Sequence, residues 1–216
     1  MALPKFSKLG ISIIFLCLFS FKVYSQVYSN KESSTFSFTA GMTSSNLIKD
    51  SIKYKSAILC SAGFVYTMVL SDNFNIGLEA LYTGKAFKNE SPIIKYRYFY
   101  IDVPLYLQYK LSDNIRFNLG AQYSTFTNSK VIVIDPNSNT GVNIKPYNNL
   151  KSADYGFLAG VEIDLNENFS LTSRYTISTS TFFQKNQINF GVFQFSLSYA
   201  VYRSHKQLLN RHIEKK

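Results

Sequence analysis

Three short turns of nearly the same sequence recur along this chain, each between two segments in which apolar and polar residues alternate. They are Leu70-Ser71-Asp72-Asn73-Phe74, Leu111-Ser112-Asp113-Asn114-Ile115 and Leu165-Asn166-Glu167-Asn168-Phe169. The connections between successive hairpins are long and polar instead. Tight turns at one end of a sheet and long loops at the other are typical of a β-barrel that crosses a bacterial outer membrane.

The segment from Phe74 to Tyr82 shows the alternation clearly. Its even-numbered positions are all apolar or aromatic, whereas Asn75, Gly77 and Glu79 occupy odd-numbered ones. The same period of two recurs in segments 115–123, 155–163, 169–175 and 193–199. A period of two indicates a strand with two different faces. One face is therefore expected to meet lipid and the other to line the lumen.

Three further segments, 35–43, 60–70 and 99–110, complete a predicted eight-stranded antiparallel up-and-down transmembrane β-barrel. An even number of strands places both mature termini on one side, and the short turns make that side the periplasm. The predicted outward loops are 44–59, 84–98, 126–153 and 178–187. Within the third loop, the β-branched stretch 130–134 and the Asp-Pro that follows it predict an extramembrane hairpin.

Residues 1–25 are predicted to be a secretory signal peptide, because Lys5 and Lys8 precede an apolar run over 9–21 and Ser25 suits cleavage. The barrel is then expected over 26–203, and a short basic periplasmic tail over 204–216. The tail is either a partner-docking helix or a frayed end. Cys17 lies inside the apolar run, which leaves a lipoprotein signal as an alternative.

A soluble β-sandwich is the alternative fold that composition permits, because every second strand residue is polar in either case. The signal peptide and the turn asymmetry favour the barrel. After cleavage Cys60 is the remaining cysteine, so no intramolecular disulfide is expected.

Charged residues at lumen-facing positions form the first candidate site. They are Glu79, Asp102, Arg116, Glu162 and Arg174. A barrel this narrow is filled by its own side chains, and an unpaired buried ion costs several kcal/mol. We therefore expect a structural ion network, in which Glu162 is the first candidate partner of Arg174 and Glu79 the next. Acid/base catalysis by the carboxylates is the alternative, and a filled lumen argues against a general diffusion porin.

Catalysis and metal binding find little support in the sequence. Both histidines, His205 and His212, fall in the predicted periplasmic tail, so no Ser-His-Asp site can form among the outer loops. No cluster of cysteine and histidine suggests a metal site. We expect no cofactor, no metal and no enzymatic activity.

Cations dominate the predicted outer loops of a chain whose formal net charge is +10. Lys85, Lys88, Lys95 and Arg97 are the candidate anion-binding residues. At a Gram-negative surface the nearest anions are the phosphates and carboxylates of lipopolysaccharide. A solvated basic surface is the plainer alternative, and export makes nucleic acid an unexpected partner.

Outward-facing aromatic residues near both ends of the strands are expected to form two interfacial girdles. Those predicted towards the loops are Tyr82, Tyr123, Tyr155 and Tyr175, and those towards the turns are Phe74, Tyr109, Phe169 and Tyr199.

Several motifs occur in an order that resembles the PorT-like outer-membrane β-barrel proteins of Bacteroidetes. They are GLEALY at 77–82, YIDVPL at 100–105, NLGAQY at 118–123, DYGFLAGVE at 154–162 and SRY at 173–175. The resemblance spans nearly all of the predicted mature chain. It implies an outer-membrane barrel and, through the family's named member, an association with type IX protein secretion.

Three classes of function are open to such a chain. It could be a structural or protein-interaction barrel, including an accessory to protein secretion with a secretion-system or periplasmic partner. It could instead be an adhesion or lipopolysaccharide-binding barrel that acts through its loops. An outer-membrane enzyme is the class that the sequence favours least.

Overall fold

The computed structural model describes residues 32–48, 55–88, 94–134, 141–144, 153–179 and 189–205. The described elements are β1 (Glu32–Ile48), β2 (Lys55–Val69), β3 (Phe74–Lys88), β4 (Ile94–Lys110), β5 (Ile115–Ile134), β6 (Gly141–Ile144), β7 (Ala153–Asp164), β8 (Phe169–Ser178) and β9 (Asn189–His205). The predicted signal peptide and residues 206–216 of the predicted tail lie outside the described residues. No helix in the described part of the chain is long and apolar enough to cross a membrane.

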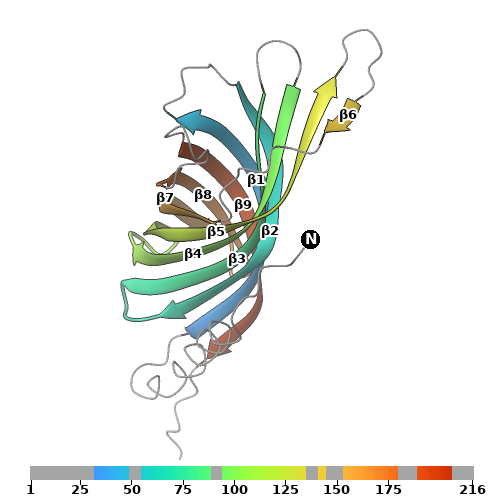
Figure 1. Cartoon of the computed structure of the whole chain (residues 1–216). Coiled ribbons are helices and arrows are strands. Elements are labelled where there is room, and N and C mark those ends of the chain that lie inside the picture. The colour runs from blue at the N-terminus through green and yellow to red at the C-terminus, as the bar shows by residue number, and fades with distance from the viewer. Residues whose placement is uncertain are drawn as a thin grey trace, which may run out of the picture. The chain divides into compact units, whose positions relative to one another are not determined.

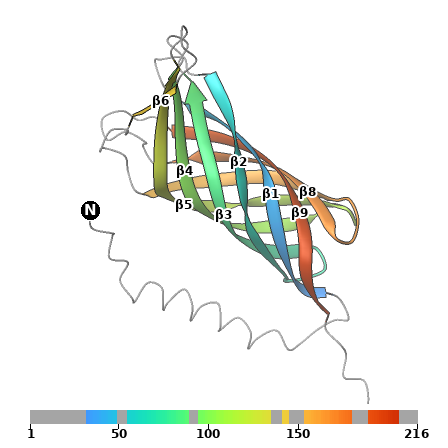
Figure 2. The same ribbon diagram turned by 90° about the vertical axis from the view of Figure 1, so that its right-hand side faces the viewer.

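The strands close into a barrel in which sequence neighbours pair in order, and β9 returns to β1 (Figures 1 and 2). Strand β6 does not belong to the ring, because it pairs with β5 at the far end of that strand. The ring therefore has eight strands, which confirms the predicted closed antiparallel barrel. Closure leaves no unpaired sheet edge in the part of the barrel that meets lipid.

The three recurring turns share one geometry. In each, the backbone N–H of the leucine donates to the carbonyl of the residue that starts the next strand, at 2.9 Å in all three. The carbonyl of the asparagine before that residue accepts an N–H from the neighbouring hairpin: Lys110 donates to Asn73, Asp164 to Asn114 and Ala200 to Asn168. The repeated sequence thus closes each hairpin and ties it to the next one. We call this end of the barrel the turn end and the opposite end the loop end.

The two faces of the barrel carry the polarity expected from the sequence. Along β8, Thr172, Arg174 and Thr176 are buried in the lumen, whereas Tyr175 and Ile177 are exposed outside. Large apolar side chains are exposed on the outer face of every ring strand, as a lipid-facing surface requires.

Outward aromatic residues pair across neighbouring strands at two levels. At the turn end, the rings of Phe74 and Tyr109 lie 5.2 Å apart, centroid to centroid, and those of Phe169 and Tyr199 lie 5.1 Å apart. Towards the loop end, Tyr123 pairs with Tyr155 at 5.3 Å. Tyr82 stacks there on Phe99, with centroids 5.6 Å apart. Seven of the eight residues in these pairs are among those predicted for the two girdles, and Phe99 is an addition. The two levels are those expected for membrane interfaces.

Several strands continue beyond the loop-end girdle, where the sequence predicted loops. β3 runs to Lys88, β4 begins at Ile94 and β5 runs to Ile134, so the predicted loop over 84–98 was placed wrongly. Strands can continue into water when their outward residues are charged, and such residues break the apolar alternation by which a membrane strand is recognised. The pairing of β5 with β6 confirms the hairpin predicted in the third loop.

Candidate functional site

The middle of the lumen is crossed by a buried ion pair. The guanidinium of Arg174 on β8 donates to both carboxylate oxygens of Glu79 on β3, at 3.0 and 2.9 Å, and also to Oε1 of Gln194 at 3.1 Å. Arg174 is 2% and Glu79 6% exposed. The hydroxyl of Tyr106 hydrogen-bonds the same carboxylate. The expected partnership of Arg174 with Glu162 is therefore wrong, because the glutamate on β3 is the one that reaches Arg174 across the lumen.

Glu162 belongs to a second cluster at the turn end. Its Oε1 lies 2.9 Å from Nη2 of Arg116, and its Oε2 accepts a 2.7 Å hydrogen bond from Gln108. Arg116 also pairs with Asp164. These side chains are only partly buried, so water screens them more than it screens the central pair. The predicted lumen network thus exists as separate clusters.

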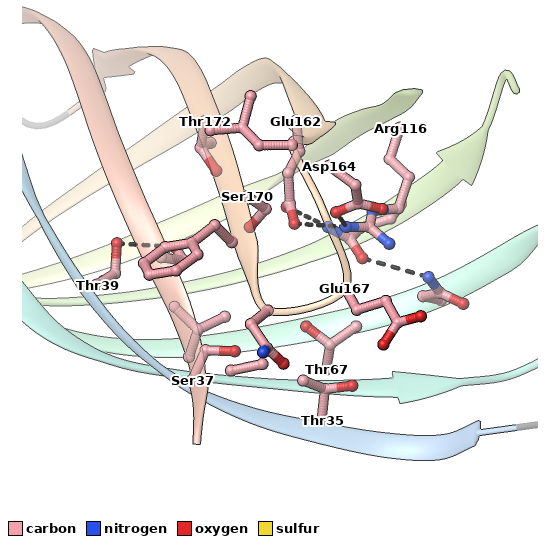
Figure 3. Close-up of a pocket in the computed structure, with 18 of the residues that line it drawn as sticks. Thr35, Ser37, Thr39, Thr67, Arg116, Glu162, Asp164, Glu167, Ser170 and Thr172 are labelled. Carbon is pink, nitrogen blue, oxygen red and sulfur yellow. Dashed lines mark hydrogen bonds and ion pairs between the residues drawn. The ribbon is translucent and has the colours of Figure 1, made fainter. Parts of the chain in front are cut away.

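A polar cavity of about 450 Å³ lies at the turn end of the lumen. Figure 3 shows Arg116, Glu162 and Asp164 on one side of it and a group of hydroxyl-bearing side chains around the rest. The labelled hydroxyl residues are Thr35, Ser37, Thr39, Thr67, Ser170 and Thr172. Glu79 and Tyr106 of the central cluster also line the cavity. The lumen is therefore partly hollow, whereas the sequence predicted a lumen filled throughout by side chains.

Lys85 forms a third cluster, nearer the loop end. Its Nζ lies 3.7 Å from Oδ1 of Asp102 and 3.9 Å from Oδ2 of Asp154. The same Nζ lies 4.2 Å from the ring centroid of Tyr100, which adds a cation–π contact. Lys85 is 2% exposed, so its placement among the loop anion-binding residues is wrong. It faces inward because odd-numbered positions of β3 line the lumen, and Asp102 provides its counter-ion.

Around Lys85 and towards the loop end, the lumen contains an aromatic plug, which we define as Phe87, Tyr98, Tyr100 and Phe190. All four are at most 3% exposed. The ring of Phe87 lies 5.7 Å from that of Tyr98 and 6.3 Å from that of Phe190, centroid to centroid. The plug packs aromatic rings into the lumen near its loop end, with Phe87 two residues beyond Lys85 on β3. The sequence reasoning missed it, although the alternation Lys95-Tyr96-Arg97-Tyr98 carries the signal.

The other three predicted anion-binding residues lie on the outer face of the same strands. In the β3–β4 register, Lys88 is opposite Lys95 and Ala86 is opposite Arg97. Phe87, Tyr96 and Tyr98 point inward, where their rings contact one another, so the residues between them point outward. Beyond Lys85, β3 and β4 therefore carry cations on the outer face and aromatic rings on the inner face, which reverses the polarity of the membrane segment.

The lumen clusters have the chemistry of structural contacts. The carboxylates of Glu79, Asp102 and Glu162 each lie beside a cation, which suits charge neutralisation in a confined space better than proton transfer. No group of three or more His, Cys, Asp or Glu side chains that could hold a metal occurs among the described residues.

Solved outer-membrane barrels share this fold. The crystal structure of Ail, the attachment invasion locus protein of Yersinia pestis, matches with a TM-score of 0.50 and 13% identity over 79% of this chain and 99% of that one. Neisserial surface protein A matches with a TM-score of 0.50 and 14% identity over 78% of this chain and 99% of its own. At such identities the likeness shows the fold alone. No curated protein sequence matches this chain significantly.

A family model describes the chain more directly. The model of the outer membrane protein beta-barrel domain matches residues 13–200, which is most of the chain and covers seven ring strands fully and β9 as far as residue 200. The closed ring, the exposed apolar belt between two aromatic girdles and this match agree with one another, and the chain belongs to the outer membrane protein beta-barrel domain family.

Proposed function

We propose that this barrel is a non-conducting anchor with a structural or protein-interaction role, which holds a β-ribbon at the cell surface. The observation that carries the proposal is the extension of β4 and β5 beyond the loop-end girdle. Strand β7 pairs with β5 only as far as Thr125, whereas the β4–β5 ladder continues to the pair Ile94 and Val133. The ribbon then continues into β6, as Figure 1 shows.

The packing of the lumen among the described residues supports an anchoring role over a transport role. The pair Arg174–Glu79, the cluster around Lys85 and the aromatic plug succeed one another between the turn-end cavity and the loop end. A solute would have to displace several buried ion pairs and a packed aromatic layer, and breaking a buried pair costs about 3–5 kcal/mol.

The PorT-like resemblance suggests the specific form of this role, an accessory to protein secretion that contacts a secretion-system or periplasmic protein. The proposal places the turn end and both mature termini in the periplasm and the ribbon outside. Adhesion through the surface ribbon is the alternative, because an exposed ribbon edge can pair with a strand of another protein.

Site-specific crosslinking in intact cells tests the interaction role. A crosslinker at Asn128, an exposed outward residue opposite Phe99 at the base of the ribbon, should capture a protein partner. The same crosslinker at Leu119, which is 59% exposed at mid-barrel, is the matched control and should capture no specific protein. Identical adduct patterns from the two positions would contradict an interaction role for the ribbon.

Orientation and conductance are tested separately. In a Cys60→Ser background, a membrane-impermeant thiol reagent should label Asn128→Cys in intact cells and should not label Asn73→Cys in a tight turn. The refolded barrel should show no steady conductance in a planar bilayer. A stable open current would contradict the proposal that the barrel is non-conducting.

A further inference from the structure

Four cations on β3, β4 and β5 lie in cross-strand register on the outer face of the barrel beyond the loop-end girdle, and Lys55 on β2 lies opposite the first of them. Lys88 on β3 is opposite Lys95 on β4, and Arg97 on β4 is opposite Lys130 on β5. Residues directly opposite each other in an antiparallel pair have Cβ atoms roughly 5 Å apart, and like charges there are destabilising. The described stretches that carry these cations, 84–88, 94–98 and 128–132, contain no acidic residue. We call Lys88, Lys95, Arg97 and Lys130 the basic patch.

All four side chains point away from the lumen. Tyr96 and Tyr98 flank Arg97 on β4 and contact Phe87 inside the barrel. On β5, Val131 is 9% exposed and pairs with inward Tyr96, whereas Lys130 is exposed. The cations are therefore directed towards whatever surrounds the barrel laterally, and they cannot neutralise the carboxylates of the lumen.

The height of the patch identifies those surroundings. Phe99 stacks on Tyr82 in the loop-end girdle, and the apolar outward residues Ile101 and Leu105 follow it on the same strand into the lipid-facing belt. At roughly 3.3 Å per residue, Arg97 lies about 7 Å and Lys95 about 13 Å along β4 from Phe99. The polar layer of a membrane extends roughly 5–8 Å beyond the hydrocarbon on each side. Because the strands are tilted, the patch lies at the level of lipid headgroups and just beyond them.

We infer that the basic patch is a binding site for the phosphate groups of lipopolysaccharide in the surrounding leaflet, approached from the side of the barrel. The planar Arg97 guanidinium can hold two oxygens of one phosphate, and the three lysines supply further charge. A bound phosphate would also offset the repulsion between the cations that face each other across the strands, so the like-charge pairs suit a phosphate-binding site. This inference rests on the proposed placement of the ribbon at the cell surface.

The test measures retention of the refolded protein in zwitterionic detergent on immobilised lipopolysaccharide, across a salt series. Changing Lys88, Lys95, Arg97 and Lys130 together to Gln should weaken retention on the order of tenfold or more, and Arg97→Gln alone about twofold or more. Lys110→Gln, which removes one cation at the turn end, is the matched control and should leave retention unchanged. Arg97→Lys should recover only part of the loss from Arg97→Gln, because the two-oxygen contact is gone.

Two further probes separate a phosphate site from diffuse charge. Enzymatically dephosphorylated lipopolysaccharide should retain the unaltered protein about as weakly as intact lipopolysaccharide retains the four-residue variant. Retention on immobilised phosphatidylglycerol should differ much less between the unaltered protein and the variants. The inference would be overturned if the four substitutions weakened retention on phosphatidylglycerol as much as on lipopolysaccharide. It would also be overturned if removing the phosphates left retention on lipopolysaccharide unchanged.

Stability measured without lipopolysaccharide gives an independent readout. Because the four cations repel one another, the four-residue variant should unfold at the same or higher urea concentration than the unaltered protein, even though its affinity falls. A clear loss of stability in the four-residue variant would show that the patch also serves the fold, and retention would then be judged from the folded variant Arg97→Gln. Unchanged retention of Arg97→Gln would overturn the inference. Since purified components are used, failure here is separate from failure of the surface placement, which the labelling of Asn128→Cys reports.

Discussion

Arg174 and Glu79 meet across the lumen through two parallel hydrogen bonds, although 95 residues separate them in the chain. Both side chains are almost fully buried, and Gln194 takes a further hydrogen bond from the guanidinium. The pair ties β3 to β8, which lie on different sides of the ring.

Arg174→Met should lower the free energy of unfolding by about 3–5 kcal/mol, because it leaves the buried carboxylate of Glu79 without a cation. Arg174→Met combined with Glu79→Gln should recover much of that loss. Urea unfolding of the refolded barrel in vesicles measures both. Arg174→Met combined with Glu162→Gln is the matched control and should recover nothing, because Glu162 pairs with Arg116.

Lys85→Met should destabilise the barrel, since Asp102 and Asp154 would lose their shared cation in a buried site. Adding Asp102→Asn should restore part of the stability. Lys88→Met, three positions away on the outer face, should have little effect on unfolding. Retention of the folded variants on lipopolysaccharide should show the opposite pattern. Lys88→Met should be retained more weakly than the unaltered protein, whereas Lys85→Met should be retained equally well. The reverse result would return Lys85 to the binding surface.

Gly77→Ala should destabilise the barrel by about 1–3 kcal/mol, the usual cost of overpacking. A Cβ at position 77 would lie 2.3 Å from the ring of Tyr106, its cross-strand partner. The ring covers the glycine backbone and directs its hydroxyl at Glu79. Tyr106→Leu replaces the ring by a smaller side chain. In that background, Gly77→Ala should lower the free energy of unfolding far less. Thermal unfolding of the two single variants and the double variant gives the coupling free energy between positions 77 and 106. Losses of stability that simply add in the double variant would contradict the steric cause.

The strands and turns were predictable because each depends on local sequence. A period of two defines the two faces of a strand, and the repeated Leu-to-Asn turns define where hairpins close. The partner of Arg174 was not predictable in the same way. It depends on which positions of β3 and β8 reach the same height in the lumen, and strand tilt and stagger around the whole ring set that height.

The position of Lys85 escaped the sequence reasoning for a different reason. The predicted loops begin where the outward apolar residues end, because the end of the apolar pattern predicts the end of a strand. The ladder instead continues, with Lys95 and Arg97 outside and Tyr96 and Tyr98 inside. The period of two is intact in this stretch, and only the side on which the apolar residues lie has changed. A strand that leaves the membrane but still encloses a packed interior must reverse its polarity in this way.

A last prediction concerns the assignment of the faces within the membrane. Leu119 is 59% exposed on the lipid side of β5, whereas Gln122 on the same strand is 6% exposed in the lumen, where it donates to Ser124. Leu119→Arg should cost about 2–4 kcal/mol, because it places a cation against hydrocarbon near mid-membrane. Gln122→Asn should cost much less, since a shorter amide remains among polar neighbours. Folding yield into vesicles and urea unfolding report both changes. Equal losses would mean that the two residues share an environment, and then the inside and outside of the barrel would have to be reassigned.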